Sequence, residues 1–181
     1  MGKREFDEYL KKRRADTEAV VQIDWSEKRD DWLQYLADFY NQVEKFLGEY
    51  RESGDVAFNY DEKDIREELI GQYRVRSLRI RIKDKDVVLD PVGTNLIGAK
   101  GRVDMIGDAG TVKFVLVDRR LNGPGLSVAI KTQGKPREVE EEKEAEGIEW
   151  AWKIATPPPR IKYIEVNAES FFDALMEVIN A

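Results

Sequence analysis

The residue types that this chain lacks limit the chemistry it can perform. Its 181 residues include no histidine and no cysteine. Disulfides, thiolate zinc sites, cysteine nucleophiles, serine–histidine triads and imidazole general bases are therefore excluded. Any catalysis must use carboxylates, lysine, arginine, tyrosine or hydroxyl groups. A hard cation such as Mg²⁺ is the metal that these side chains would favour.

One acidic segment has a spacing that suits such chemistry. Residues 101–120, GRVDMIGDAGTVKFVLVDRR, predict a strand that carries Asp104, a tight turn, and an apolar strand that ends in acid-x-base. This pattern resembles the core of the PD-(D/E)xK nucleases, in which two carboxylates hold Mg²⁺ and a lysine stabilises charge beside the attacking water. The resemblance implies that Asp104 and Asp118 are metal ligands. It also implies that Arg120 stands where the family has lysine, and that Glu67 or Glu68 supplies a third carboxylate.

The geometry of a simple hairpin gives the same residues a structural role. If the turn is centred at 108–109, Asp104 faces Lys113 and Asp118 lies five residues further along the strand. At about 3.3 Å per residue, this offset separates the two aspartates by roughly 17 Å, which is too far for one cation. Asp104 and Lys113 then form a cross-strand charge pair worth at most about 1 kcal/mol. We therefore predict hairpin structure, with an active or inactive Mg²⁺-dependent nuclease as the alternative.

Arginines alternate with apolar residues in residues 73–83, YRVRSLRIRIK, which we call the arginine comb. Leu78 and Ile80 predict the buried face of a strand, and Arg79 and Arg81 project from the other face. Arginines beside aromatic residues can bind RNA or DNA, so a nucleic-acid-binding domain is a second alternative. The chain carries 36 acidic and only 30 basic residues. We therefore expect the comb to pair with acids on neighbouring strands or on an acidic protein partner.

Further candidate contacts with a partner lie in two other segments. Residues 91–102, PVGTNLIGAKGR, contain glycines that predict a bent or bulged connection between strands. Lys100 and Arg102 close this segment and are candidates to bind an anionic partner. Trp150 and Trp152 alternate along a predicted strand and therefore point to the same side. They are candidate partner contacts if that side is exposed.

The helices that must support these segments are clear in the sequence. Residues 25–52 predict a long helix capped by Asp24, because apolar residues recur there at three- and four-residue spacing. We expect its apolar stripe to cover one face of a sheet. Short helices are predicted at 3–15 and at 61–70, the second with Asp61 as its cap and Gly71 as its left-handed stop. A C-terminal helix is predicted after its cap Asn167.

Strand patterns fill most of the remaining chain. The predicted strands are 56–60, 73–83, 86–92, 101–107, 111–119, 126–132, 148–156 and 161–166. Short connections favour antiparallel neighbours. We therefore predict a single α+β domain, 1–181, in which a mostly antiparallel meandering sheet packs against a long N-terminal helix and a C-terminal helix. Residues 1–23 are expected to form a flexible N-terminal arm and residues 133–147 a charged mobile loop.

Composition and patterning favour an interaction protein of the cytoplasm. The chain is 41% hydrophobic and 36% charged, with a formal net charge of -6. No apolar run approaches the roughly 20 residues that span a bilayer, and the charged start lacks the apolar core of a signal peptide. We predict a non-enzymatic module that binds a protein partner, such as an immunity factor, adaptor or secretion-chaperone-like protein. No membrane or nucleic-acid partner and no cofactor are expected, and Mg²⁺ enters only with the nuclease alternative.

Overall fold

The computed structural model describes residues 2–18, 24–94, 98–124 and 147–180. Its helices are α1 (Gly2–Glu18), α2 (Trp25–Phe46), α3 (Gly48–Glu52) and α5 (Ala168–Ile179). Its strands are β1 (Val56–Glu67), β2 (Gly71–Ile82), β3 (Lys85–Gly93), β4 (Gly101–Gly107), β5 (Gly110–Asp118), β6 (Trp150–Ala155) and β7 (Tyr163–Glu165). None of the described helices is long and apolar enough to cross a membrane.

The seven strands form one sheet in which every neighbouring pair is antiparallel. Their order in the sheet, β1 to β7, is also their order in the chain. Short turns suffice for such a meander. The predicted α+β architecture with an antiparallel meandering sheet is therefore confirmed. The predicted strand at 126–132 and residues 133–146 of the predicted charged loop lie outside the described residues.

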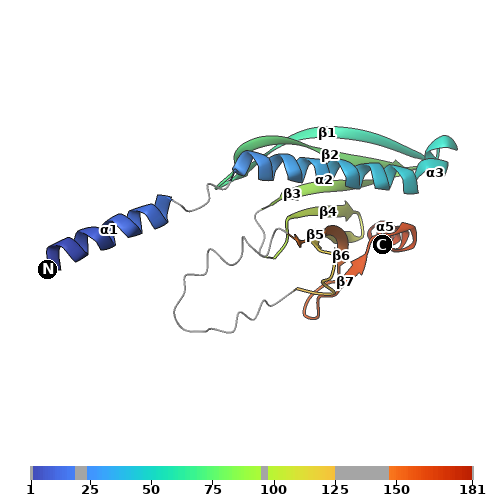
Figure 1. The fold of residues 1–181 in the computed structure, drawn as a ribbon. Helices are drawn as coiled ribbons and strands as arrows, with labels where there is room; N and C mark the ends of the chain where they lie inside the picture. Colours follow the sequence, from blue (N-terminus) through green and yellow to red (C-terminus); the bar gives the residue numbers. More distant parts are fainter. Residues whose placement is uncertain (1, 19–23, 95–97, 125–146, 181) are drawn as a thin grey trace.

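Helices α2 and α5 contribute to one hydrophobic core with the sheet. Trp32, Phe39 and Val43 of α2 are buried in the same cluster as Phe171 of α5. The rings of Phe46 and Phe171 lie 5.3 Å apart, so the two helices meet. Figure 1 shows α2 running along the β1–β2 hairpin, while α1 extends away from the sheet beyond the N-terminal end of α2. The apolar stripe of α2 therefore covers a sheet face, as predicted.

The ends of the helices follow their capping residues. The Asp24 side chain accepts hydrogen bonds from the backbone N–H groups of Ser26 and Glu27, at 2.9 and 3.2 Å. These bonds satisfy free donors of the first turn of α2. The predicted long helix is interrupted at Leu47, so that its last turn forms the separate helix α3. Asn167 caps α5 as predicted.

The helix predicted at 61–70 is wrong, because this segment continues β1 and enters a hairpin turn. Every residue of β1 from Val56 to Glu67 pairs with β2. Opposite charges face each other in the extension: Nη1 of Arg74 lies 3.2 Å from Glu62. Gly71 does have the positive φ expected of it, +87°, but there it begins β2 and does not end a helix. Pairing with β2 thus overrides the local helix signals.

Candidate functional site

Asp104 and Asp118, the candidate metal ligands, are separated on the β4–β5 hairpin. Asp104 pairs with Lys113, as the sequence predicts, and Asp118 lies five residues further along β5. Arg102 donates two hydrogen bonds of 2.7 Å to Asp104, so the charges of these two side chains compensate each other. Within the described ranges, no three acidic side chains gather as they would around a metal ion.

Asp118 and Arg120 form a pair with each other. Nη2 of Arg120 donates to Asp118 at 2.6 Å, and the backbone N–H of Arg120 donates to the same carboxylate at 3.0 Å. The side-chain hydrogen bonds from Arg120 and, after them, its backbone hydrogen bond lower the pKa of Asp118 to about 2. The carboxylate is therefore ionised at neutral pH and is compensated by its neighbour in the chain.

Glu67 stands at the end of β1 and binds backbone and side-chain donors. Thr94 donates to it from the backbone N–H at 3.1 Å and from Oγ1 at 2.7 Å. The Tyr73 hydroxyl also donates to Glu67. Burial and, after it, this hydrogen bond raise the pKa of Tyr73. Glu67 is 8% exposed. It therefore connects the tip of the β1–β2 hairpin to the end of β3.

Gly93 allows the end of β3 to approach Glu67 closely. Its φ is +128°, and a Cβ atom there would lie 2.9 Å from Oε1 of Glu67. The β3–β4 register shifts between Pro91 and Gly93. The bulged connection predicted from the glycines is therefore present. It brings Thr94 to Glu67.

The arginine comb is paired within the sheet. Arg79 lies 3.2 Å from Asp61 on β1 and 3.7 Å from Asp86 on β3. Arg81 donates two hydrogen bonds to Asp86, at 3.0 and 3.3 Å. The bond from Arg81 lowers the pKa of Asp86. Both arginines thus have acidic partners on the neighbouring strands, which is the arrangement expected for an acidic chain.

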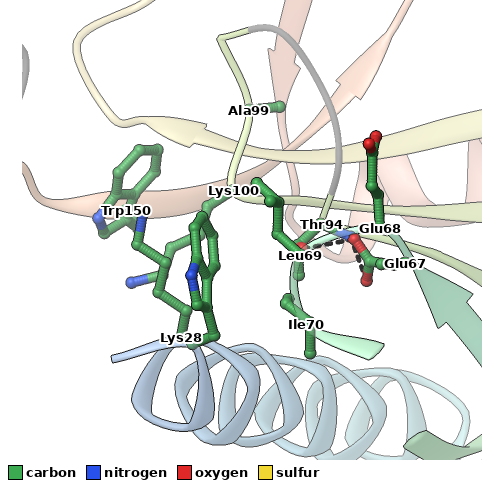
Figure 2. Close-up of a pocket in the computed structure, with 10 residues that line it drawn as sticks. Lys28, Glu67, Glu68, Leu69, Ile70, Thr94, Ala99, Lys100 and Trp150 are labelled. Carbon is green, nitrogen blue, oxygen red and sulfur yellow. Dashed lines mark hydrogen bonds between the residues drawn. The ribbon is translucent and has the colours of Figure 1, made fainter. Parts of the chain in front are cut away.

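A pocket of about 440 Å³ lies at the N-terminal end of α2. Four parts of the fold meet there: the first turn of α2, the β1–β2 turn, the β3–β4 connection and the start of β6. We call it the tryptophan–lysine pocket. Its lining residues are Trp25, Lys28, Glu67, Glu68, Leu69, Ile70, Thr94, Ala99, Lys100 and Trp150. Figure 2 shows Lys28, Lys100 and Trp150 gathered on one side, with Leu69 and Ile70 beside them.

Each lysine of the pocket lies over an aromatic ring. Nζ of Lys28 is 5.0 Å from the centre of the Trp25 ring. Nζ of Lys100 is 5.4 Å from the Trp150 ring, and an oxygen of Asp31 lies 3.3 Å from it. Such cation–π contacts contribute roughly 0.5–1 kcal/mol each at exposed sites. They also hold positive charge beside the apolar surface of the rings.

The two tryptophans of β6 have different roles. Trp152 stacks on Phe39 of the core at 4.7 Å, and its Nε1 donates to the Tyr35 carbonyl at 3.1 Å. Trp150 is half-buried and lines the pocket. Among the residues expected to contact a partner, the structure therefore brings together Lys100 and Trp150. Trp152 contributes to the interior of the fold.

The sequence analysis gives no functional role to six residues of the pocket lining: Trp25, Lys28, Leu69, Ile70, Thr94 and Ala99. Trp25 belongs to the predicted apolar stripe of the long helix, and Leu69 and Ile70 fall in the helix wrongly predicted at 61–70. The sequence of residues 61–70, DEKDIREELI, has no apolar alternation that would extend β1 to the turn at Leu69. The alternation of buried Ile65 and Glu67 with exposed neighbours becomes visible only in the structure. No family model, curated protein or solved structure matches this chain. Its function is therefore argued from this geometry.

Proposed function

We propose that this chain is a non-enzymatic protein-interaction module that binds an acidic, apolar segment of a protein in the tryptophan–lysine pocket. The observation that carries the proposal is the surface of the pocket, where Leu69 is 62% exposed. The same pocket holds two tryptophan rings, each with the ammonium group of a lysine over it. The cytoplasmic location expected from the sequence belongs to the same proposal.

The apolar part of the proposal rests on exposed side chains that the fold does not use. Leu69 stands at the tip of a hairpin, and Trp25 and Trp150 are only half-buried. A contiguous apolar surface rimmed by polar residues marks an interaction site. Tryptophan is enriched among the residues that contribute most to protein–protein affinity. A partner's apolar side chain inserted here would remove these surfaces from water.

The acidic part rests on the charges around the same surface. Lys28 and Lys100 lie over the tryptophan rings, where a carboxylate of the ligand could reach an ammonium group while its neighbours cover the rings. Glu67 already accepts hydrogen bonds from Thr94 and Tyr73. It therefore shapes the wall of the pocket. Because Lys100 also pairs with Asp31 at 3.3 Å, we assign the recognition of charge mainly to Lys28, which is exposed.

A protein ligand suits these charges better than a nucleic acid. Binding to phosphates requires a surface with excess positive charge. The net charge of the chain is -6, and Arg79 and Arg81 of the comb are engaged by Asp61 and Asp86. The candidate catalytic carboxylates are likewise bound by Arg102 and Arg120.

The proposal is tested by capture from extract of the native cells, with variants that separate the pocket from the rest of the surface. Full-length protein is immobilised as wild type, Leu69→Asp, Trp150→Ala and Met176→Asp. Met176 on α5 is the matched control because it is another exposed apolar residue, 50% accessible, outside the pocket lining. We expect a protein that wild type and Met176→Asp retain, and that both pocket variants retain at least about tenfold less.

The retained protein is then purified and titrated by calorimetry into the same four forms. Affinity that falls at least about tenfold in Leu69→Asp and is unchanged in Met176→Asp supports the proposal. If every retained protein binds the pocket variants as well as wild type, the assignment of this pocket is wrong.

A further inference from the structure

The tryptophan–lysine pocket has opposite charges on its two sides. Figure 2 shows Lys28 and Lys100 on one side and Glu67 and Glu68 on the other, with the apolar side chains of the β1–β2 turn between them. The pocket therefore has a positive end and a negative end, separated by apolar surface.

At the positive end, Lys28 is the lysine that remains available to a ligand. Lys100 lies 3.3 Å from an oxygen of Asp31. Lys28 is exposed and forms no ion pair within the part of the chain that the structure describes. Its ammonium group lies 5.0 Å from the centre of the Trp25 ring, which keeps its charge at the pocket. A carboxylate of a ligand can therefore bind Lys28 without breaking an ion pair of the fold.

At the negative end, the corresponding residue is Glu68. Glu67 is 8% exposed and already accepts hydrogen bonds from Tyr73 and Thr94, so its acceptor sites are largely occupied. Glu68 stands next to it in the β1–β2 turn, is exposed, and has no hydrogen bond or ion pair with any other described residue. Each end of the pocket thus offers one charged side chain that the fold does not use.

We propose that the segment bound in this pocket carries opposite charges at its two ends: an acidic residue contacts Lys28, apolar residues cover Leu69, and a basic residue contacts Glu68. This inference rests on the proposed function and specifies the ligand of the same pocket. Complementary charges across an interface chiefly select the partner, because a ligand with a like charge at either end is repelled. A segment with acidic residues at both ends is therefore rejected by Glu68.

The test uses a display library of random twelve-residue peptides, so that the probe is independent of the native partner. Peptides are selected on immobilised full-length wild type, Lys28→Glu and Glu68→Lys. In each case, peptides that still bind the same protein carrying Leu69→Asp are removed, which leaves the ligands of the pocket. Both charged residues are exposed, so near-ultraviolet circular dichroism of the two variants should match that of wild type.

The charges of the selected peptides should follow the charges of the pocket. Wild type is expected to select peptides with an acidic residue on one side of the apolar residues and a basic residue on the other. Lys28→Glu should select basic residues on both sides, and Glu68→Lys should select acidic residues on both sides. In calorimetry, a peptide selected on wild type should bind each variant roughly three- to tenfold more weakly, because each reversal replaces an attraction with a repulsion.

Two charge reversals elsewhere are the matched controls. Lys162 and Glu177 are exposed and lie outside the pocket lining. Lys162→Glu and Glu177→Lys change the charge of the chain as much as the pocket variants do. We expect both controls to bind the wild-type peptides with unchanged affinity.

The outcomes distinguish this inference from the proposed function. Pocket-dependent peptides that carry only one kind of charge, or whose charges do not follow the two substitutions, overturn the ligand with opposite charges at its ends and leave the proposed function standing. Equal weakening by the control reversals overturns it as well. If no selected peptide depends on Leu69, both proposals are wrong.

Discussion

Replacing Glu67 with alanine should destabilise the fold, because this carboxylate joins the tip of the β1–β2 hairpin to the end of β3. The change removes the acceptor of three donors: the Tyr73 hydroxyl, the Thr94 backbone N–H and the Thr94 hydroxyl. A hydrogen bond to a charged group contributes about 1.5–3 kcal/mol. Thr94 is half-buried, so water can replace part of what it loses, whereas Tyr73 is buried. We expect a loss of about 3 kcal/mol in the free energy of unfolding.

The assay is urea unfolding followed by tryptophan fluorescence, with Glu68→Ala as the matched control. Glu68 is the next residue in the chain and is exposed, so its substitution should change the free energy of unfolding by less than about 0.5 kcal/mol. Glu67→Ala should also weaken capture of the partner, since the hairpin tip that carries Leu69 loses its support. If the two variants unfold within about 1 kcal/mol of each other, the structural role given to Glu67 is refuted.

Three further predictions concern the core, the ion pairs and metal binding. Gly101→Ala should lower the melting temperature by roughly 5–10 °C, because a Cβ atom there would lie 2.1 Å from the Trp32 ring; Gly48→Ala, with no atom within 4 Å, is the calorimetric control. Because the pKa of Asp118 is held at about 2, below the usual value near 3.9, the stabilisation from its pairing is present above about pH 4 and lost as the pH falls through 2. Arg120→Gln should raise that pKa, which carboxyl NMR measures; an unchanged value would contradict the pairing. Mn²⁺ titrated by calorimetry into wild type and Asp118→Ala should give equal heats, and binding lost in the variant would restore the nuclease alternative.

The parts of the fold that depend on neighbouring residues could be predicted from the sequence. Asp24 and Asn167 begin their helices because their side chains accept hydrogen bonds from backbone N–H groups within the next three residues. The pairing of Asp104 with Lys113 also followed, because the turn lies between Gly107 and Gly110 as expected. Local spacing fixes such features.

The errors arise where distant segments decide the structure. The capping signals of Asp61 and Gly71 favoured a helix, but pairing with β2 extends β1 through this segment. That error also hid the place of Leu69 at a hairpin tip. The pocket itself combines Trp25 of α2 with Trp150 of β6, which lie far apart in the sequence. No spacing within the sequence predicts that these two residues line one pocket.

The central claim, that the tryptophan–lysine pocket binds an acidic, apolar segment of a protein, is tested most directly by calorimetric titration of the captured partner into wild type, Leu69→Asp and Met176→Asp. We predict an affinity that falls at least about tenfold in Leu69→Asp, that is unchanged in Met176→Asp, and that weakens with increasing salt, because charge contacts are screened. An affinity that Leu69→Asp leaves unchanged would contradict the claim.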